Sequence, residues 1–310
     1  MALANTLDLA ERADAWGYHR YWVSEHHNDP AFAHASPEIL VGALASRTKR
    51  IRVGAGGVLL THYSPFKVAE QFNLLEALYP GRVDLGVGRA GGGEGLSDNA
   101  LRPWGADSAS HWDKVQHLLA YLGMGRESAK PFAGVDAMPL PANAPPLWVL
   151  GTSPASAQFA GEHGLPYAFG GFIDPRQLMA CLSTYHQRFQ PSRWLERPQA
   201  QVTWVVLAAD TEAQAKELGR SAEVWFVRTF ARGQTSRFPT VAEAFDERLS
   251  PQEEALALFR RQHALAGTAD QVLDGLAKMQ RQLALDELGL VTLTADHADR
   301  VRSYELLAKG

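Results

Sequence analysis

Four short clusters hold the residues best suited to chemistry, and each follows an apolar segment that is typical of a β-strand. The clusters are Glu25-His26-His27-Asn28, Gly56-Gly57, Gly88-Arg89 and Gly151-Thr152-Ser153. In a barrel of parallel strands the carboxyl ends of the strands meet at one face, so clusters that are distant in the sequence come together in space. We therefore expect an active site at that face.

The adjacent histidines His26 and His27 suggest acid–base chemistry or a metal site, because imidazole titrates near neutral pH and also binds zinc and iron. Neighbouring residues on a strand point to opposite faces, so two ligands for one barrel interior need a His-x-His spacing, which is missing here. We expect no metal. One histidine should face the pocket as a hydrogen-bond donor or acid–base group, and the other should pack with Glu25 behind it. A polar turn without chemistry is the alternative.

The pair Ser153-Pro154 is typical of a helix start, since serine favours the N-cap and proline the first helical position. A helix N-terminus presents free N–H groups and a partial positive charge, which suit an anion. The hydroxyl groups of Thr152, Ser153 and Ser156 could add donors. The sequence thus suggests a phosphate site, although a plain helix cap explains Ser153 equally well.

Arg89 strengthens the anion hypothesis because it follows the end of a neighbouring strand and has glycines beside it. A guanidinium in this position suits a phosphate or the edge of a flavin ring. The alternative is an ion pair with Asp84 or Glu94. Gly56-Gly57 permits a flat ligand to approach the backbone closely, and a bulge or tight turn is the alternative.

Strand-like and helix-like segments alternate along the chain and must position these clusters. Helical spacing alternates with seven clear strands and a short one near Ala264, and the clear strands are marked by Tyr21, Ile51, Val83, Leu147, Tyr167, Val202 and Leu288. This order predicts a single domain over residues 1–310 with an α/β fold, a (β/α)8 TIM barrel. A doubly wound open sheet is the alternative, but the first strand-to-helix turn lacks Gly-x-Gly-x-x-Gly. We expect a mainly helical insertion over residues 211–262.

Composition limits the partners and the compartment. The chain has 310 residues, with 30 basic and 34 acidic side chains and a net charge of −4, which gives no electrostatic reason to expect nucleic acid or anionic lipid as a partner. Cys181 is the sole cysteine, so no disulfide forms within the chain. The sequence shows neither a signal peptide nor an apolar run of roughly 18 residues. We expect a cytoplasmic protein.

Together these motifs resemble the bacterial luciferase-like flavin monooxygenase family over nearly the whole chain. The resemblance rests on residues 18–28 (YHRYWVSEHHN), 53–58 (VGAGGV), 68–72 (VAEQF), 79–89 (YPGRVDLGVGR) and 150–153 (LGTS). It implies a (β/α)8 barrel that binds reduced FMN at the carboxyl ends of the strands, where oxygen forms a flavin C4a-peroxide that oxidises a small organic substrate.

The resemblance also implies roles for particular residues. His26 corresponds to the catalytic histidine of the family, and Gly56 and Gly57 to a site where a non-prolyl cis peptide often lies against the isoalloxazine. Arg89 corresponds to an arginine near the flavin phosphate. Thr152, Ser153 and Ser156 correspond to the phosphate-binding turn and helix start.

The chain departs from the family pattern at two places. Bacterial luciferase has a reactive cysteine where this chain has Gly88, so we do not expect light emission from a long-chain aldehyde. Family members begin with a strand, whereas this sequence starts in the first helix. A missing strand exposes two strand edges, and we expect a truncated start rather than an open barrel.

The resemblance favours a two-component monooxygenase that receives reduced FMN from a separate flavin reductase, because no segment resembles a nicotinamide site. One alternative is an F420-dependent dehydrogenase, and another is a catalytically silent flavin-binding protein. A homodimer is also implied. Specificity in such barrels lies in loops, here residues 90–104 and 233–251, and the substrate itself cannot be deduced.

Overall fold

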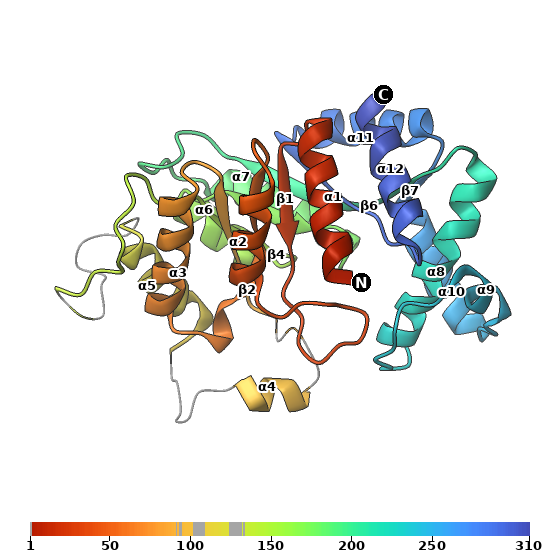
Figure 1. The fold of residues 1–310 in the computed structure, drawn as a ribbon, viewed down its shortest axis with the longest axis horizontal. Helices are drawn as coiled ribbons and strands as arrows, with labels where there is room; N and C mark the ends of the chain where they lie inside the picture. The colour runs from red at the N-terminus through yellow and green to blue at the C-terminus, as the bar shows by residue number, and fades with distance from the viewer. Residues whose placement is uncertain (1, 91, 93–94, 102–108, 124–131, 133) are drawn as a thin grey trace.

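The computed structural model describes residues 2–90, 92, 95–101, 109–123, 132 and 134–310. Helices surround a parallel sheet (Figure 1). The strands are β1 (Arg20–Val23), β2 (Arg52–Leu59), β3 (Val83–Gly88), β4 (Leu147–Gly151), β5 (Tyr167–Gly170), β6 (Ala200–Ala208), β7 (Ala264–Gly267) and β8 (Glu287–Val291).

Helices connect the strands in the order that the sequence predicts. The α-helices are α1 (Ala2–Trp16), α2 (Pro37–Arg47), α3 (Pro65–Leu78), α4 (Gly95–Leu101), α5 (His111–Tyr121), α6 (Pro154–Glu162), α7 (Leu178–Arg188), α8 (Glu212–Phe230), α9 (Val241–Asp246), α10 (Pro251–Gln262), α11 (Ala269–Leu283) and α12 (His297–Lys309). Two short 3-10 helices are η1 (Leu60–His62) and η3 (Pro175–Gln177). No helix in the described part of the chain is long and apolar enough to cross a membrane.

Every pairing in the sheet is parallel, and neighbouring strands follow chain order from β1 to β7. Strand β6 is the longest and takes three partners: its first residues pair with β5 and β8, and its last four pair with β7. The α/β class, the TIM-barrel type of fold and the helical insertion over α8, α9 and α10 are confirmed.

Side chains connect β1 and β8, two strands that do not pair with each other through their backbones. Within the described residues, β1 pairs only with β2, and β8 pairs only with β6. Arg20 of β1 lies 2.5 Å (Nε to Oε1) from Glu287 of β8, and the Tyr18 hydroxyl donates to the Tyr304 carbonyl oxygen at 2.8 Å. An ion pair therefore links β1 to β8, and a hydrogen bond links the segment before β1 to α12.

A large apolar core fills the space between the sheet and its helices, with Trp148, Tyr167, Tyr185 and Phe72 among its fully buried side chains. Asp84 is one of the polar side chains buried with this core, and its carboxylate is fully buried. It accepts hydrogen bonds from Arg20, Arg52 and the indole of Trp22. This pairing compensates the cost of placing a charge in the interior.

Local sequence explains where most helices begin and end. Gly17 takes a φ of +86°, which glycine adopts without a Cβ clash, and α1 ends directly before it as expected. Ser110, Ser153, Thr240, Ser250 and Thr268 form capping boxes at the starts of five helices. Two elements differ from expectation. Strand β2 continues to Leu59 rather than ending near Val53, and helix α4 forms within the predicted loop 90–104.

Candidate functional site

The register of the sheet brings the four predicted clusters to one face. Val23, the last residue of β1, pairs with Ala55 of the parallel strand β2. His26 therefore lies beyond the carboxyl end of β1, at the end of the sheet toward which both strands run. Leu59 pairs with Gly88, which precedes Arg89, and Val87 pairs with Val149 two residues before Gly151. In Figure 1 the β1 arrow points to the side of the molecule on which α4 lies, which is this face.

Gly56 and Gly57 lie within β2 rather than at its end. The peptide bond between them is cis, and the pairing of β2 with β3 shifts register between Ala55 and Val58. A Cβ on Gly57 would lie 2.8 Å from the Gly86 carbonyl oxygen, and a Cβ on Gly56 would lie 3.0 Å from Trp22. Packing alone therefore disfavours a side chain at Gly57, whereas a side chain at Gly56 would require Trp22 to shift by a few tenths of an ångström.

His26 lies in the loop after β1 with its ring packed flat on Phe32. The two ring centroids are 3.7 Å apart and the planes differ by 9°. Burial lowers the pKa of His26 to about 4, an effect that the carboxylate of Asp29 only partly opposes. The imidazole is therefore neutral at neutral pH, with one ring nitrogen able to donate a hydrogen bond and the other able to accept one.

Glu25 connects the end of β1 to the end of β2. Its buried carboxylate accepts hydrogen bonds from the Leu59 amide at 2.8 Å and from the Tyr63 hydroxyl at 2.7 Å. His27 Nε2 lies 2.7 Å from the same carboxylate, and the His27 amide donates to the Gly92 carbonyl oxygen. The expectation that one histidine packs with Glu25 is confirmed for His27.

Helix α6 begins at the face as predicted, with Ser153 as its N-cap. The Ser153 side chain accepts from the Ser156 amide, and the Ser156 hydroxyl donates to the Ser153 carbonyl oxygen at 2.7 Å. Ser156 is buried and its hydroxyl also lies 3.4 Å from that of Tyr167, so this side chain serves the cap. Thr152 directly precedes the cap, and the hydroxyls of Thr152 and Ser153 are the less buried ones.

Arg89 is exposed just beyond β3. The alternative partner Asp84 is held by Arg20 and Arg52 instead, and Glu94 lies outside the described residues. Burial lowers the pKa of His111, at the start of α5, to about 4, and the nearby Arg89 charge adds to this effect. The Arg89 charge therefore lies close enough to His111 to disfavour its protonated form.

Sequence reasoning missed Tyr63, His111 and the aromatic contacts of Phe32. A signal existed for Tyr63, because it follows β2 as the predicted clusters follow their own strands. Phe32 lies in the loop before α2 and Trp225 on α8, with ring centroids 6.0 Å apart. Nothing in their separate sequence neighbourhoods indicates this contact.

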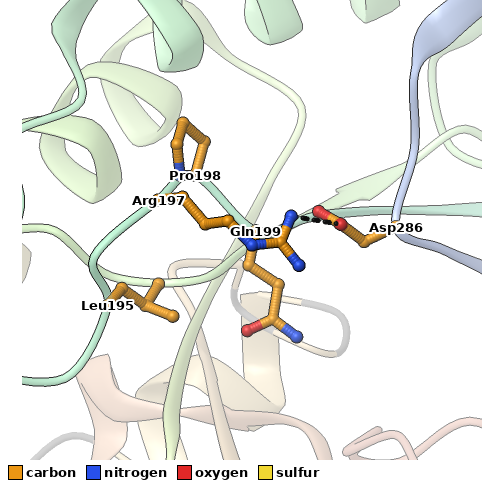
Figure 2. A pocket seen from close by; sticks show the side chains of 5 residues that line it. All are labelled: Leu195, Arg197, Pro198, Gln199 and Asp286. Carbon is orange, nitrogen blue, oxygen red and sulfur yellow. Dashed lines mark hydrogen bonds and ion pairs between the residues drawn. The ribbon is translucent and has the colours of Figure 1, made fainter.

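No group of three or more metal-ligating side chains occurs among the residues that the structure describes. A pocket of about 180 Å³ is lined by Leu195, Arg197, Pro198, Gln199 and Asp286 (Figure 2). It precedes β6 and β8 and so lies at the amino ends of those strands, away from His26.

The sequence model described as luciferase-like monooxygenase matches residues 1–286. A luciferase-like monooxygenase of Escherichia coli strain K12 is 37% identical over 305 residues, covering 98% of this chain and 90% of that protein. An N-acetyl-S-alkylcysteine monooxygenase of Bacillus subtilis is 32% identical over 310 residues, covering 99% of this chain and 91% of that protein.

Solved structures show the same fold. The crystal structure of apo-MsnO8 has a TM-score of 0.87 at 37% identity, covering 99% of this chain and 91% of that one. More distant folds include the oxygenating constituent of 3,6-diketocamphane monooxygenase from Pseudomonas putida in complex with FMN, at a TM-score of 0.71 and 21% identity, covering 99% of this chain and 91% of that one. Another is the coenzyme F420 dependent tetrahydromethanopterin reductase from Methanopyrus kandleri, at 0.72 and 13%, covering 99% and 94%. This chain belongs to the luciferase-like monooxygenase family.

Proposed function

We propose that the protein is a flavin-dependent monooxygenase that uses reduced FMN and dioxygen to oxidise a small organic substrate. The observation that carries the proposal is the convergence of His26, Arg89 and the start of α6 at the carboxyl ends of neighbouring strands. Family membership supports oxidoreductase chemistry. The described residues offer no nicotinamide-binding motif, so a separate flavin reductase supplies the reduced cofactor.

The donor set suits the phosphate of FMN. The N-terminus of α6, together with Thr152 and Ser153, supplies N–H and O–H donors, and Arg89 supplies a positive charge across the β3–β4 pairing. Ser156 supports this turn through its cap. Gly56 and Gly57 provide a stretch of backbone without side chains for the ring to approach.

Bound reduced FMN would supply the electrons that activate dioxygen. His26 is placed to hold a proton near that chemistry, since its neutral ring can donate from one nitrogen and accept at the other. Phe32 covers one face of the imidazole and keeps water from it. Glu25 fixes the adjacent His27 and thereby the loop that carries His26.

The test is stopped-flow absorbance after mixing the reduced FMN complex with oxygenated buffer, for the native protein and for His26→Ala. We expect an absorbance transient between reduced and oxidised flavin whose lifetime falls roughly 100-fold or more in the variant. His19→Ala is the matched control, because His19 is exposed at the opposite end of β1 and should leave the transient unchanged. Reoxidation at the rate of free flavin would contradict the proposal.

F420-dependent dehydrogenation is the second candidate, because F420-dependent enzymes share this fold. Oxygen consumption separates the two: a monooxygenase consumes dioxygen during turnover, whereas a dehydrogenase transfers hydride without it. A silent flavin-binding protein would bind FMN without either activity. A cytoplasmic homodimer remains a prediction, which sedimentation and cell fractionation can test.

A further inference from the structure

Arg260 of α10 is held between α8 and the segment that follows β5. Its Nη1 donates to the Phe172 carbonyl oxygen at 2.8 Å, and its Nη2 donates to the Ile173 carbonyl oxygen at 3.1 Å. The guanidinium carbon lies 3.2 Å from the centre of the Phe226 ring. Two carbonyl groups and a ring face thus fix both the position and the plane of the charge.

The charge of Arg260 has no carboxylate partner within ion-pair distance among the described residues. The nearby Asp174 is paired with Arg176 instead, at 2.8 Å. Burial lowers the pKa of Arg260 to about 10, and the charge of Asp174 only partly opposes this effect. Each Nη carries two hydrogens and uses one in the bonds described, so donors remain for an anion.

Aromatic rings connect Arg260 to His26. The Arg260 guanidinium lies 5.9 Å from the ring centre of Phe230, and Phe230 lies 6.5 Å from Trp225. Trp225 contacts Phe32 edge-on at 6.0 Å, and Phe32 stacks on His26. A continuous row of contacts therefore runs from the candidate catalytic histidine to a positive charge that has no carboxylate partner among the described residues.

Apolar side chains beside Arg260 are open to solvent. Phe172 is 36% exposed, Ile173 52% and Phe230 59%. The segment containing Phe172 and Ile173 directly follows β5, so it belongs to the same face of the barrel as the FMN site proposed above. An apolar surface with one fixed cation at its edge suits a ligand that carries both an apolar part and a negative charge.

We propose that Arg260 binds the carboxylate of the substrate and that the substrate is an apolar organic acid whose hydrocarbon part lies along Phe230, Trp225 and Phe32. This inference rests on the proposed function for the nature of the reaction. Oxidation occurs at the end of the substrate near His26, and the carboxylate stays at Arg260. Arg260 thus determines specificity, and the aromatic row sets the distance between the reacting atom and the acid group.

The experiment measures equilibrium binding to the complete protein by titration calorimetry with three probes: 3-phenylpropanoate, the neutral alcohol 3-phenylpropan-1-ol, and inorganic phosphate. We expect the native protein to prefer the acid over the alcohol by roughly 10-fold or more, because a hydrogen bond to a charged group is worth more than one to a neutral group. Arg260→Met should remove this preference without weakening the alcohol. Arg260→Lys should retain part of it.

Lys216→Gln is the matched control, since it removes an exposed positive charge at the other end of α8, leaves the pair of Asp174 with Arg176 intact and should leave the preference unchanged. Equal binding of acid and alcohol by the native protein would overturn the proposal, even if Arg260→Met failed to fold. Phosphate binding as tight as that of the acid would assign Arg260 to a phosphate instead. None of these binding measurements uses flavin or oxygen. The substrate proposal can therefore be contradicted while the stopped-flow test supports the monooxygenase, and the monooxygenase can be contradicted while Arg260 still binds the acid.

Discussion

The core around the first five strands and the helices α8, α9 and α10 are held together by different forces. Large apolar side chains such as Trp148 and Tyr167 fill the core, and its main charged group, Asp84, is fully buried. In contrast, Ala244 is the buried residue of α9 and Ala257 that of α10. Figure 1 shows these two helices beside the lower part of α8, at one end of the molecule.

Ion pairs supplement the few buried apolar side chains of the second region. Arg232 reaches Glu247 and Glu253, both at 2.6 Å, and Arg261 reaches Glu223 at the same distance. Such partly exposed pairs weaken when salt screens their charges, whereas burial of apolar area does not weaken in this way. The region that lines our proposed substrate site can therefore change its sequence at little cost to the barrel that carries the cofactor site.

The largest expected effect belongs to the core, in Asp84→Asn. Removing this charge leaves Arg20 and Arg52 without their shared buried carboxylate, and breaking such a pair should lower the free energy of unfolding by about 3 kcal/mol. Urea unfolding followed by circular dichroism measures the change. Asp286→Asn, which breaks an exposed pair with Arg197, is the control, with an expected change of less than about 0.5 kcal/mol. If Asp84→Asn and Asp286→Asn lowered the free energy of unfolding by similar amounts, the difference between buried and exposed pairs would be refuted.

His26 lies between the two regions, because its ring stacks on Phe32, which in turn contacts Trp225 of α8. We expect its protonation to change the free energy of unfolding by an intermediate amount that depends on pH. The pKa of His26 is about 4 in the folded protein and about 6.5 when exposed, so the unfolded chain binds its proton more tightly. The stabilising contribution is complete above pH 6.5 and is lost as the pH falls toward 4. After allowance for partial exposure, we expect His26 to account for about 2 kcal/mol of that loss.

Urea unfolding at pH 7, 6, 5 and 4 compares the native protein with His26→Phe and Phe32→Leu. The first variant should lose less stability on acidification, and the second should raise the pKa of His26 by admitting water to its ring, which proton NMR detects. His19→Ala should follow the native curve. A pKa of His26 near 6.5 in the native protein would contradict this account.

Periodicity and turn residues predicted the core well, because most barrel strands are short apolar runs that end at or beside a glycine or serine. They failed where tertiary contact decides the local structure. β2 continues through Gly56 and Gly57 because the neighbouring β3 backbone pairs with both halves of the strand, which no local pattern records. Helix α4 lies in a glycine-rich stretch whose composition indicates a loop.

For the site, the sequence predicted the positions of the residues, and their roles stay predictions. It placed His26, Arg89 and Thr152 after strands, and the register of those strands brings them to one face. Ser156 takes part in the helix cap, and its predicted contact with the phosphate stays a prediction. Arg260 had no signal, because an arginine in a charged helix resembles any solvated residue until its missing carboxylate partner is seen in three dimensions.

The smallest effect is expected in α8 to α10. Arg232→Met removes the pairs with Glu247 and Glu253 but leaves Arg228 paired with Glu247, so the shift in Tm should be roughly 2 °C or less. Hydrogen exchange is the more sensitive measurement. Amides of α9 and α10 should exchange faster in the variant, and those of β2 and β3 should not.

Salt distinguishes ion pairing from packing as the cause. If ion pairs hold the region, raising the ionic strength to 1 M should speed exchange in α9 and α10 of the native protein and largely remove the difference from Arg232→Met. Arg302→Met, which breaks exposed pairs with Asp210 and Glu305, should leave exchange in α9 and α10 unchanged. A difference that persists in high salt would mean that the alkyl stem of Arg232, and not its charge, fastens this region, and the contrast with the core would then be one of packing density alone.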